Sequence, residues 1–518
     1  MLTRKLLTRG YLPKELPPLF SSETLGNIVG SANLPAPFIQ ASAKWSSAVS
    51  HDLARPGRLR RRLSIPNPVN FFRLASAFEQ YQAVLAVEWN KSPYSFTTPD
   101  LALTNGRGMV VEVKDRATPR VWARVGARYV LHTDIAQFYP SIYTHSIPWV
   151  IHTKPVAKAS PKDMTLIGNI LDKEIQACQV GQTKGIAIGP DTSLGIAELL
   201  LSPLDERLKN DCNIVGGCRF IDDIELTFRT LSDADKALTL IEALLNELEL
   251  QPNALKTHIK ELPVEIESSF VTTLRSNLPV ANNAPQSQWI DYFNRAFKAA
   301  KDDPTTGVLR YAVAALIGVR PTATTEDIAQ HLLWQCVTID PGCIRHVVDV
   351  LATNRLAGVK LDPSIATEAV DSVIRISAAA GHSSEVVWGI WAAMYLGFQI
   401  GVESQAAISE MDDALVASAA MFASTTTQVF QQPFDPPRWK SWFQQDCFYQ
   451  EHWLFVFEAY RRGWFAPEVA TSQVANELCA SFLLNSGVTF INENALTTYV
   501  PRRASGVSGR GVSGGASG

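Results

Sequence analysis

The stretch FIDDIEL at residues 220–226 decides the fold of this chain, together with TDIAQFY at residues 133–139. Asp134 in one stretch, and Asp222 with Asp223 in the other, adjoin runs of β-favouring residues. We therefore expect all three carboxylates at strand ends or turns. Neighbouring strands would gather them as oxygen ligands for a pair of hard divalent cations about 3.5–4 Å apart. The open alternative is that Asp222 and Asp223 form only a hairpin turn.

A glycine-rich loop lies between the two acidic stretches. Gly181, Gly185 and Gly189 precede a helix that we expect from Leu194 to Leu208. Glycines let a backbone approach a ligand closely, and the start of a helix presents free amide groups. Such a loop is suited to lie under a base pair. The alternative is that one of the residues 191–193 simply caps the helix.

The order and the wording of these stretches resemble motifs A, B and C of reverse transcriptases. The strings TDIAQFYPSIYTHSIPW (133–149), GIAIGPDTSLGIAELLLS (185–202) and FIDD (220–223) are similar to the abortive-infection and unknown-group reverse transcriptases of bacterial phage defence, the relatives of AbiK. Upstream, RGYLPKELPP (9–18) and RRLSIPNP (61–68) resemble the fingers segments of that family. The resemblance extends over residues 9–265.

The resemblance implies a metal-dependent catalytic centre. Asp134, Asp222 and Asp223 match the catalytic and metal-binding aspartates, and the backbone carbonyl of Ile135 would bind the same metal as Asp134. The implied cofactor is Mg²⁺ or Mn²⁺. His132 shares a strand face with Asp134 if one strand runs through both. Because magnesium selects oxygen ligands, we expect His132 to be a hydrogen-bonded structural residue.

Four further residues are implied to bind the substrate. Arg61 would reach the triphosphate, Tyr139 would lie against the sugar C2′ position and exclude ribonucleotides, Gly189 belongs to the glycine-rich loop, and Lys256 would act as general acid toward pyrophosphate. The alternatives are a solvated basic face over residues 55–62 for Arg61, a core aromatic for Tyr139 and a plain surface lysine for Lys256.

The implied function is a DNA polymerase of antiphage (abortive infection) immunity that makes DNA from dNTPs. Relatives either prime on a protein hydroxyl and copy no template, or depend on a noncoding RNA. Template-copying reverse transcriptases usually carry Pro-Gln-Gly where this chain has Ala187-Ile188-Gly189. This departure motivates the alternative of a catalytically silent RNA-binding scaffold or phage sensor built on the same palm.

Composition limits the cellular setting. A hydrophobic content of 46% with 19% charged residues indicates a globular protein, and a net charge of only −3 argues against a globally basic nucleic-acid coat protein. The seven cysteines form no CxxC pairs and are expected to be reduced thiols in the cytoplasm. No apolar stretch of about 18 residues appears, so we expect no membrane role.

The second half of the chain changes character. From Trp289 onward, amphipathic helical patterns are broken by Pro or Gly about every twenty residues, so that helix pairs repeat at roughly forty. The family resemblance likewise implies a helical-repeat domain here, and relatives that form closed homo-oligomers, a trimer or hexamer. We expect an α+β fold in which right-hand polymerase fingers and palm, an antiparallel sheet with helices, precede an all-α HEAT-like repeat domain. The expected boundaries are an N-terminal segment with fingers at 1–120, a palm at 121–276, a linker at 277–288, helical repeats at 289–500 and a flexible Gly/Ser tail at 501–518.

Overall fold

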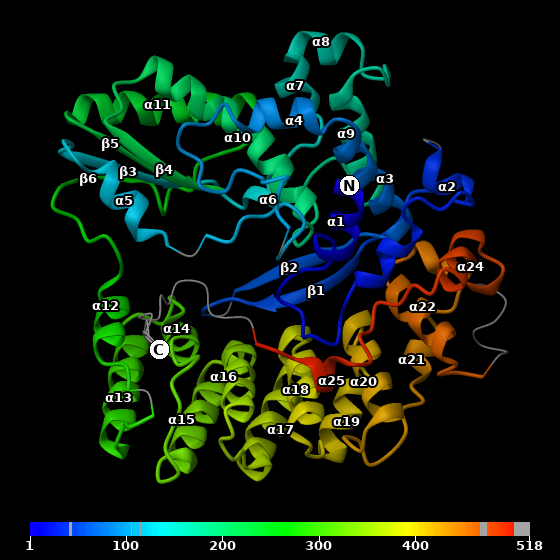
Figure 1. Cartoon of the computed structure of the whole chain (residues 1–518). Helices are drawn as coiled ribbons and strands as arrows, with labels where there is room; N and C mark the ends of the chain where they lie inside the picture. The colour runs from blue at the N-terminus through cyan, green and yellow to red at the C-terminus, as the bar shows by residue number, and fades with distance from the viewer. Residues whose placement is uncertain are drawn as a thin grey trace, which may run out of the picture.

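The structure is a computed structural model that describes residues 1–40, 44–57, 59–104, 106–113, 115–280, 282–466 and 474–501. Arg58 of the predicted basic face, and residues 502–518 of the predicted tail, lie outside the described residues. A sheet with its helices forms one part of the molecule, and an arc of helices from the second half of the chain lies beside it (Figure 1). The α+β class expected from the sequence is confirmed.

A four-stranded antiparallel sheet carries the acidic stretches. Its strand order is β4-β5-β3-β6. On β5, Ile224, Leu226 and Phe228 are buried on one face, while Asp223 and Glu225 occupy the other. Helix α11 covers the apolar face and the short helix α5 covers the acidic face (Figure 1). The strand bounds are β3 Tyr129–Asp134, β4 Gly216–Phe220, β5 Asp223–Phe228 and β6 His258–Glu261.

Helices surround this sheet and the hairpin below it. Their bounds are α1 Leu2–Arg9, η1 Glu23–Ile28, α2 Ala36–Ile39, α3 Pro68–Gln80, α4 Gln82–Trp89, α5 Ala117–Ala123, α6 Phe138–Ser141, α7 Ser146–His152, α8 Lys154–Ala159, α9 Ile167–Ala177, α10 Asp191–Asp211, α11 Leu231–Glu247 and α12 Ser269–Ser276. Helix α10 begins three residues before the expected start at Leu194, because Pro190 is extended and already serves as the N-cap. The predicted boundary at residue 120 falls inside α5, which packs on β4 and β5.

A two-stranded hairpin, β1 Val49–Ala54 and β2 Arg60–Ile65, projects between the sheet and the helical part (Figure 1). The basic residues Arg60, Arg61 and Arg62 all lie on β2. Among the described residues β1 pairs with β2 alone, and it also contacts α18 of the helical part. The residues predicted to form the fingers therefore contact both halves of the chain.

The helical part is a two-layered array in which each helix packs on its next-but-one neighbour. Pairs such as α15 with α17, α17 with α19 and α18 with α20 are in contact. Its bounds are α13 Gln286–Asp302, α14 Val308–Ala314, α15 Glu326–Ile339, η2 Pro341–Cys343, α16 Ile344–Leu356, α17 Pro363–Ala379, α18 Ser383–Leu396, α19 Val402–Ser409, α20 Ala414–Thr426, α21 Pro437–Lys440, η3 Cys447–Tyr449, α22 Trp453–Arg462, α24 Leu478–Asn485 and α25 Ala495–Thr498. Helix α13 starts within the predicted linker 277–288, which is therefore shorter than expected.

Backbone hydrogen bonds connect a segment near the N-terminus with a segment near the C-terminus. Phe20 forms an isolated bridge with Ile491, the amide of Ser21 donates to the carbonyl of Phe490, and the amide of Asn492 donates to Leu19. One continuous set of buried apolar side chains runs through both halves. Over the described ranges, no helix combines the length and the hydropathy that a membrane crossing requires.

Candidate active site

The three predicted aspartates meet at one end of the sheet. Asp134 is the last residue of β3 and pairs directly with Asp223, the first residue of β5. Paired residues on antiparallel strands have Cα atoms about 4.5–5.5 Å apart, and both side chains point to the same face. Asp222 lies in the tight turn between β4 and β5, next to Ile221. The turn and the strand pairing therefore bring all three carboxylates together.

The turn holds an unusual backbone conformation. Ile221 has φ of +62°, a left-handed conformation that is rare for a β-branched residue. Two contacts hold it there: its amide donates to Thr97 Oγ1 at 3.0 Å, and its carbonyl accepts from Arg219 Nη1 at 2.9 Å. The position of Asp222 therefore depends on Thr97 and Arg219, which lie outside the acidic stretches.

Arg219 is the centre of a buried brace behind this turn. Its fully buried guanidinium donates to Glu198 Oε2 at 2.9 Å and to Asp205 Oδ2 at 2.7 Å, both on α10. Thr97 also donates to Glu198 Oε1, at 2.6 Å. The brace links the helix after the glycine-rich loop to the strand that leads into Asp222. It requires a cation between two buried carboxylates, because an unpaired buried charge is very costly.

Asp223 is surrounded by cationic side chains. His132 Nε2 lies 2.7 Å from Asp223 Oδ1, and Arg120 and Arg116 on or beside α5 lie 3.5 and 3.7 Å from Oδ2. Burial raises the pKa of Asp223, but the hydrogen bond and charge of His132, with the charge of Arg120, outweigh it and hold that pKa below its usual value. The hydrogen-bonded histidine expected at position 132 is present, and its other ring nitrogen contacts the carbonyl of Lys256 at 3.1 Å.

Asp134 is paired with the predicted general acid. Lys256 Nζ lies 2.7 Å from Asp134 Oδ2, and the amide of Asn253 donates to the carbonyl of Asp134 at 2.6 Å. The turn containing Asn253 and Lys256 is therefore fastened to the end of β3. This places Lys256 within the acidic cluster instead of on a remote surface.

Among the described residues, no cationic side chain forms an ion pair with Asp222. Burial first, and then the charge of Asp134, raise its pKa above the usual value. No three His, Cys, Asp or Glu side chains within the described ranges are arranged to hold one ion, because Asp223 is turned toward its cations. The predicted ligand set of Asp134, Ile135, Asp222 and Asp223 is thus not a preformed cage. Magnesium is commonly held by one or two carboxylates plus substrate phosphates, which the pair Asp134 and Asp222 fits.

The hairpin and the turn after β3 supply candidate substrate contacts. Tyr139 is half-buried on α6, and its carbonyl accepts from the amide of Ile186 in the glycine-rich loop at 3.0 Å. Burial, followed by the charges of Asp222 and Glu198, raises the pKa of Tyr139. Arg55 follows the last residue of β1. Burial, and then the charge of Arg61, lower the pKa of Arg55, while the charges of Asp134 and Asp222 act against this decrease. Arg61 itself is exposed on β2.

The glycine-rich loop is packed against the N-terminal segment. A Cβ atom on Gly189, whose φ is +137°, would lie 2.6 Å from Pro13 Cγ, so only glycine fits there. The amide of Ser64 on β2 donates to the carbonyl of Ile188 at 2.9 Å. Gly189 is therefore a packing residue on at least one side, in addition to its predicted role near the substrate.

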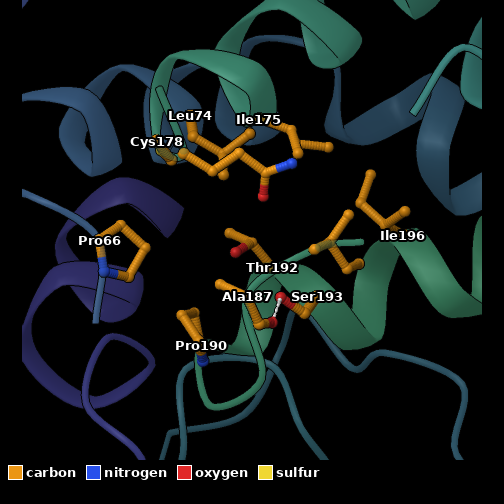
Figure 2. A pocket seen from close by; sticks show the side chains of 11 residues that line it. Pro66, Leu74, Ile175, Cys178, Ala187, Pro190, Thr192, Ser193 and Ile196 are labelled. Atoms are coloured by element: carbon orange, nitrogen blue, oxygen red, sulfur yellow. Dashed lines mark hydrogen bonds between the residues drawn. The ribbon is translucent and has the colours of Figure 1, made fainter. Parts of the chain in front are cut away.

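A small cavity lies beneath this loop (Figure 2). Figure 2 shows its walls, formed by Leu74, Ile175 and Cys178 on one side and by Ala187, Thr192 and Ser193 on the other. Ser193 Oγ donates to the carbonyl of Ala187 at 2.5 Å. The cavity of about 20 Å³ is the size of a single water and contains none of the three aspartates.

Comparison with known proteins identifies the class of the central segment. Residues 76–280 match the family described as reverse transcriptase (RNA-dependent DNA polymerase), a range that includes Asp134, Asp222, Asp223 and Lys256. Residues 76–280 of the chain therefore form a segment that is similar to a reverse transcriptase domain. The match covers less than half of the chain.

Two further comparisons were made. The structure of telomerase from Candida albicans in complex with a TWJ fragment of telomeric RNA is similar with a TM-score of 0.31 and 10% identity, over 76% of this chain and 64% of that chain. A similarity of that size assigns neither fold nor function. No curated protein matches the sequence.

Several residues of the site have no place in the sequence motifs. They are Thr97, Arg116, Arg120, His132 as a partner of Asp223, and Arg219, while Glu198 lies in a quoted motif but was assigned no role there. One signal was available: Arg116, Arg120 and Arg124 recur at four-residue spacing, which places them on one face of a helix. That spacing indicates a basic face on a short helix, but not that its partners are Asp223 and Glu225 of β5.

Proposed function

We propose that this chain is a defence-associated DNA polymerase of the AbiK-like type, which makes DNA from dNTPs by two-metal phosphoryl transfer in antiphage immunity. The observation that carries the proposal is the convergence of Asp134, Asp222 and Asp223 inside a segment that matches reverse transcriptases. Its Mg²⁺ or Mn²⁺ ions would lower the pKa of the attacking hydroxyl and stabilise the leaving pyrophosphate. The proposed partners are dNTPs and nucleic acid, as DNA product and as a noncoding RNA in the RNA-dependent version.

Each side chain of the cluster has a distinct proposed task. Asp134 and Asp222 hold the ions, with the carbonyl of Ile135 as a further ligand, and Asp223 keeps Asp222 in place through its contacts with His132 and Arg120. Lys256 is placed to give a proton to the departing pyrophosphate. Arg61 and Arg55 on the hairpin would bind the triphosphate, because a guanidinium pairs well with phosphate oxygens.

The wider setting is proposed from the family resemblance. The helical array would act as a HEAT-like repeat domain in place of a thumb, and the protein would work in the cytoplasm as a trimer or hexamer. Priming on a protein hydroxyl without a template, or guidance by a noncoding RNA, are the two versions of synthesis. Ile188, which replaces the usual polar residue of the loop, favours the untemplated version.

The second candidate is a catalytically silent RNA-binding scaffold or phage sensor. The ion pair of Lys256 with Asp134, together with the engagement of Asp223 by His132 and Arg120, motivates it, because these cations balance charge that metals would otherwise balance. This candidate predicts binding without turnover.

Metal-dependent nucleotide uptake separates the two candidates. Purified protein given labelled dNTPs and Mg²⁺, with no added primer or template, is expected to accumulate acid-precipitable label, and excess chelator is expected to stop it. Nuclease treatment followed by denaturing electrophoresis reports whether label stays on the protein. Absence of uptake with Mg²⁺, Mn²⁺, and added primed RNA or DNA templates would favour the scaffold.

Replacing Tyr139 with Ala is expected to admit ribonucleotides. Removal of the ring opens space beside the proposed sugar position, and pocket contacts of that size discriminate by about 10–200-fold. The measurement is the ratio of kcat/KM for dNTP and rNTP. Tyr139→Phe is the matched control, because it keeps the ring and should keep the exclusion. An unchanged ratio in Tyr139→Ala would leave Tyr139 as a packing residue only.

A further inference from the structure

The helical array holds the β1–β2 hairpin by its free edge. Within the described part of the chain β1 has a strand partner on one side only, so the amides of Asp52 and Ala54 on its other edge need acceptors. Ser383 Oγ accepts from Asp52 at 2.9 Å, and Ser384 Oγ accepts from Ala54 at 3.1 Å. Both serines lie in the first turn of α18 and are buried. The hydroxyls of α18 thus continue the hydrogen bonding of the strand.

An ion pair fastens the second strand of the hairpin to the same helix. Arg60 on β2 donates to Glu385 Oε1 at 2.6 Å and to Oε2 at 2.7 Å. The Glu385 side chain is only 4% exposed. A bidentate guanidinium–carboxylate pair fixes direction as well as distance. Arg60 also contacts Asp52 at 2.8 Å, so one side chain joins β2, β1 and α18.

A second arginine, Arg310, holds the end of β1 and the residue that follows it, Arg55. Arg310 on α14 donates to the carbonyls of Ala54 at 2.8 Å and Arg55 at 3.0 Å, while Asp340 fixes its guanidinium through two bonds of 2.8 Å. Two separate helices therefore set the position of the residues just before the hairpin tip. Burial first, and then the charge of Arg61, lower the pKa of Arg55, while the charges of Asp134 and Asp222 act against this decrease.

We propose that Glu385, Ser384 and Arg310 are positioning residues of the polymerase, which hold the hairpin that carries Arg55 and Arg61, the residues proposed to bind the triphosphate. The proposal rests on the proposed function and adds to it a role for the helical array. The array sets the affinity for the nucleoside triphosphate, and the hairpin stays in place between nucleotide additions. The hairpin residues and the helical residues that hold them are more than 250 positions apart in sequence, and their contacts through α14 and α18 are partly buried.

Glu385→Gln tests this role with two readouts. Losing the charge weakens the grip on Arg60, so hydrogen exchange at the amides of β1 is expected to accelerate about tenfold. The KM for dTTP is expected to rise about tenfold while kcat changes less than about twofold, because the hairpin arginines bind the triphosphate equally before and during the reaction. Ser384→Ala, a milder change that removes the acceptor of Ala54, should shift both quantities in the same direction, and serves if Glu385→Gln does not fold.

Glu403→Gln is the matched control. Glu403 on α19 pairs with Arg375 at 3.1 Å on the exposed surface, away from the hairpin, and its loss should change neither readout. Unchanged exchange at β1 in Glu385→Gln would overturn the holding role, whatever the activity. Faster exchange with an unchanged KM would overturn the link to the substrate. A wild-type protein that never incorporates dNTP refutes the proposed function and the substrate part, while the exchange rates still decide the holding role.

Discussion

Asp222→Asn is expected to abolish dNTP incorporation and to leave the fold intact. The carboxylate is proposed to bind metal in the transition state, and a metal ion supplies several kcal/mol of charge stabilisation there. Losing that support corresponds to a fall in kcat on the order of 10³-fold. The measurement is incorporation of labelled dNTP at saturating Mg²⁺.

The melting temperature of Asp222→Asn should not fall with its activity. Burial and the neighbouring charge of Asp134 raise the pKa of Asp222, so the folded protein disfavours the ionised carboxylate when no metal is bound. The neutral amide removes this repulsion, and the melting temperature in chelator should be equal to or above that of the wild type. A variant that is inactive and no less stable can only have lost chemistry.

Asp235→Asn is the control for this experiment. Asp235 is exposed on α11, which packs on the apolar face of the sheet, and the same loss of charge there should leave incorporation unchanged. If Asp222→Asn incorporated dNTP at the wild-type rate, the assignment of the aspartate cluster as the catalytic centre would be wrong.

Arg219→Met is expected to lower the free energy of unfolding by about 3–5 kcal/mol. The methionine fills a similar volume, but Glu198 and Asp205 are left buried without their shared cation. Burial already raises the pKa of Asp205 despite the charge of Arg219, so the loss of that charge would raise the pKa of Asp205 further. The turn at Ile221 also loses the donor to its carbonyl. Urea unfolding, followed by circular dichroism, measures the change.

A second arginine near the same helix provides the comparison. Arg207 on α10 pairs with Asp211 at 3.1 Å on the surface, where ion pairs contribute less than about 1 kcal/mol. Arg207→Met should therefore leave the urea midpoint nearly unchanged. Equal midpoints for the two variants would show that the buried brace does not support the turn as we argue.

Much of the site was visible in short stretches of sequence. Asp134 at a strand end, and Asp222 with Asp223 at a turn, follow from β-favouring runs that stop at acidic residues. The breaks at Pro341, Pro363 and Gly401 coincide with the starts of η2, α17 and α19, because proline and glycine act on the backbone where they stand. Local patterns of this kind report on the next few residues.

Other features needed the folded chain. The predicted domain boundary at residue 120 falls inside α5. The seven-residue helix Ala117–Ala123 has too few turns to show a clear period in the sequence, and its packing on the sheet stabilises it. His132 shares a face with Asp134 in any strand, but the carboxylate it contacts belongs to a strand 91 positions later. The partner was decided by the pairing of β3 with β5.

The β-favouring runs beside the acidic stretches, the periodic second half and the family resemblance of the motifs were enough to predict the α+β class and to name the three aspartates. The tertiary structure alone decided that Asp223 is held by arginines of α5, that Arg219 braces the turn of Asp222, and that α18 holds the hairpin. The physical reason is one of range. Backbone preference and amphipathic period act over a few residues, whereas a buried charge takes whichever partner packing brings within about 3 Å, and Arg60 and Glu385 meet across 325 positions.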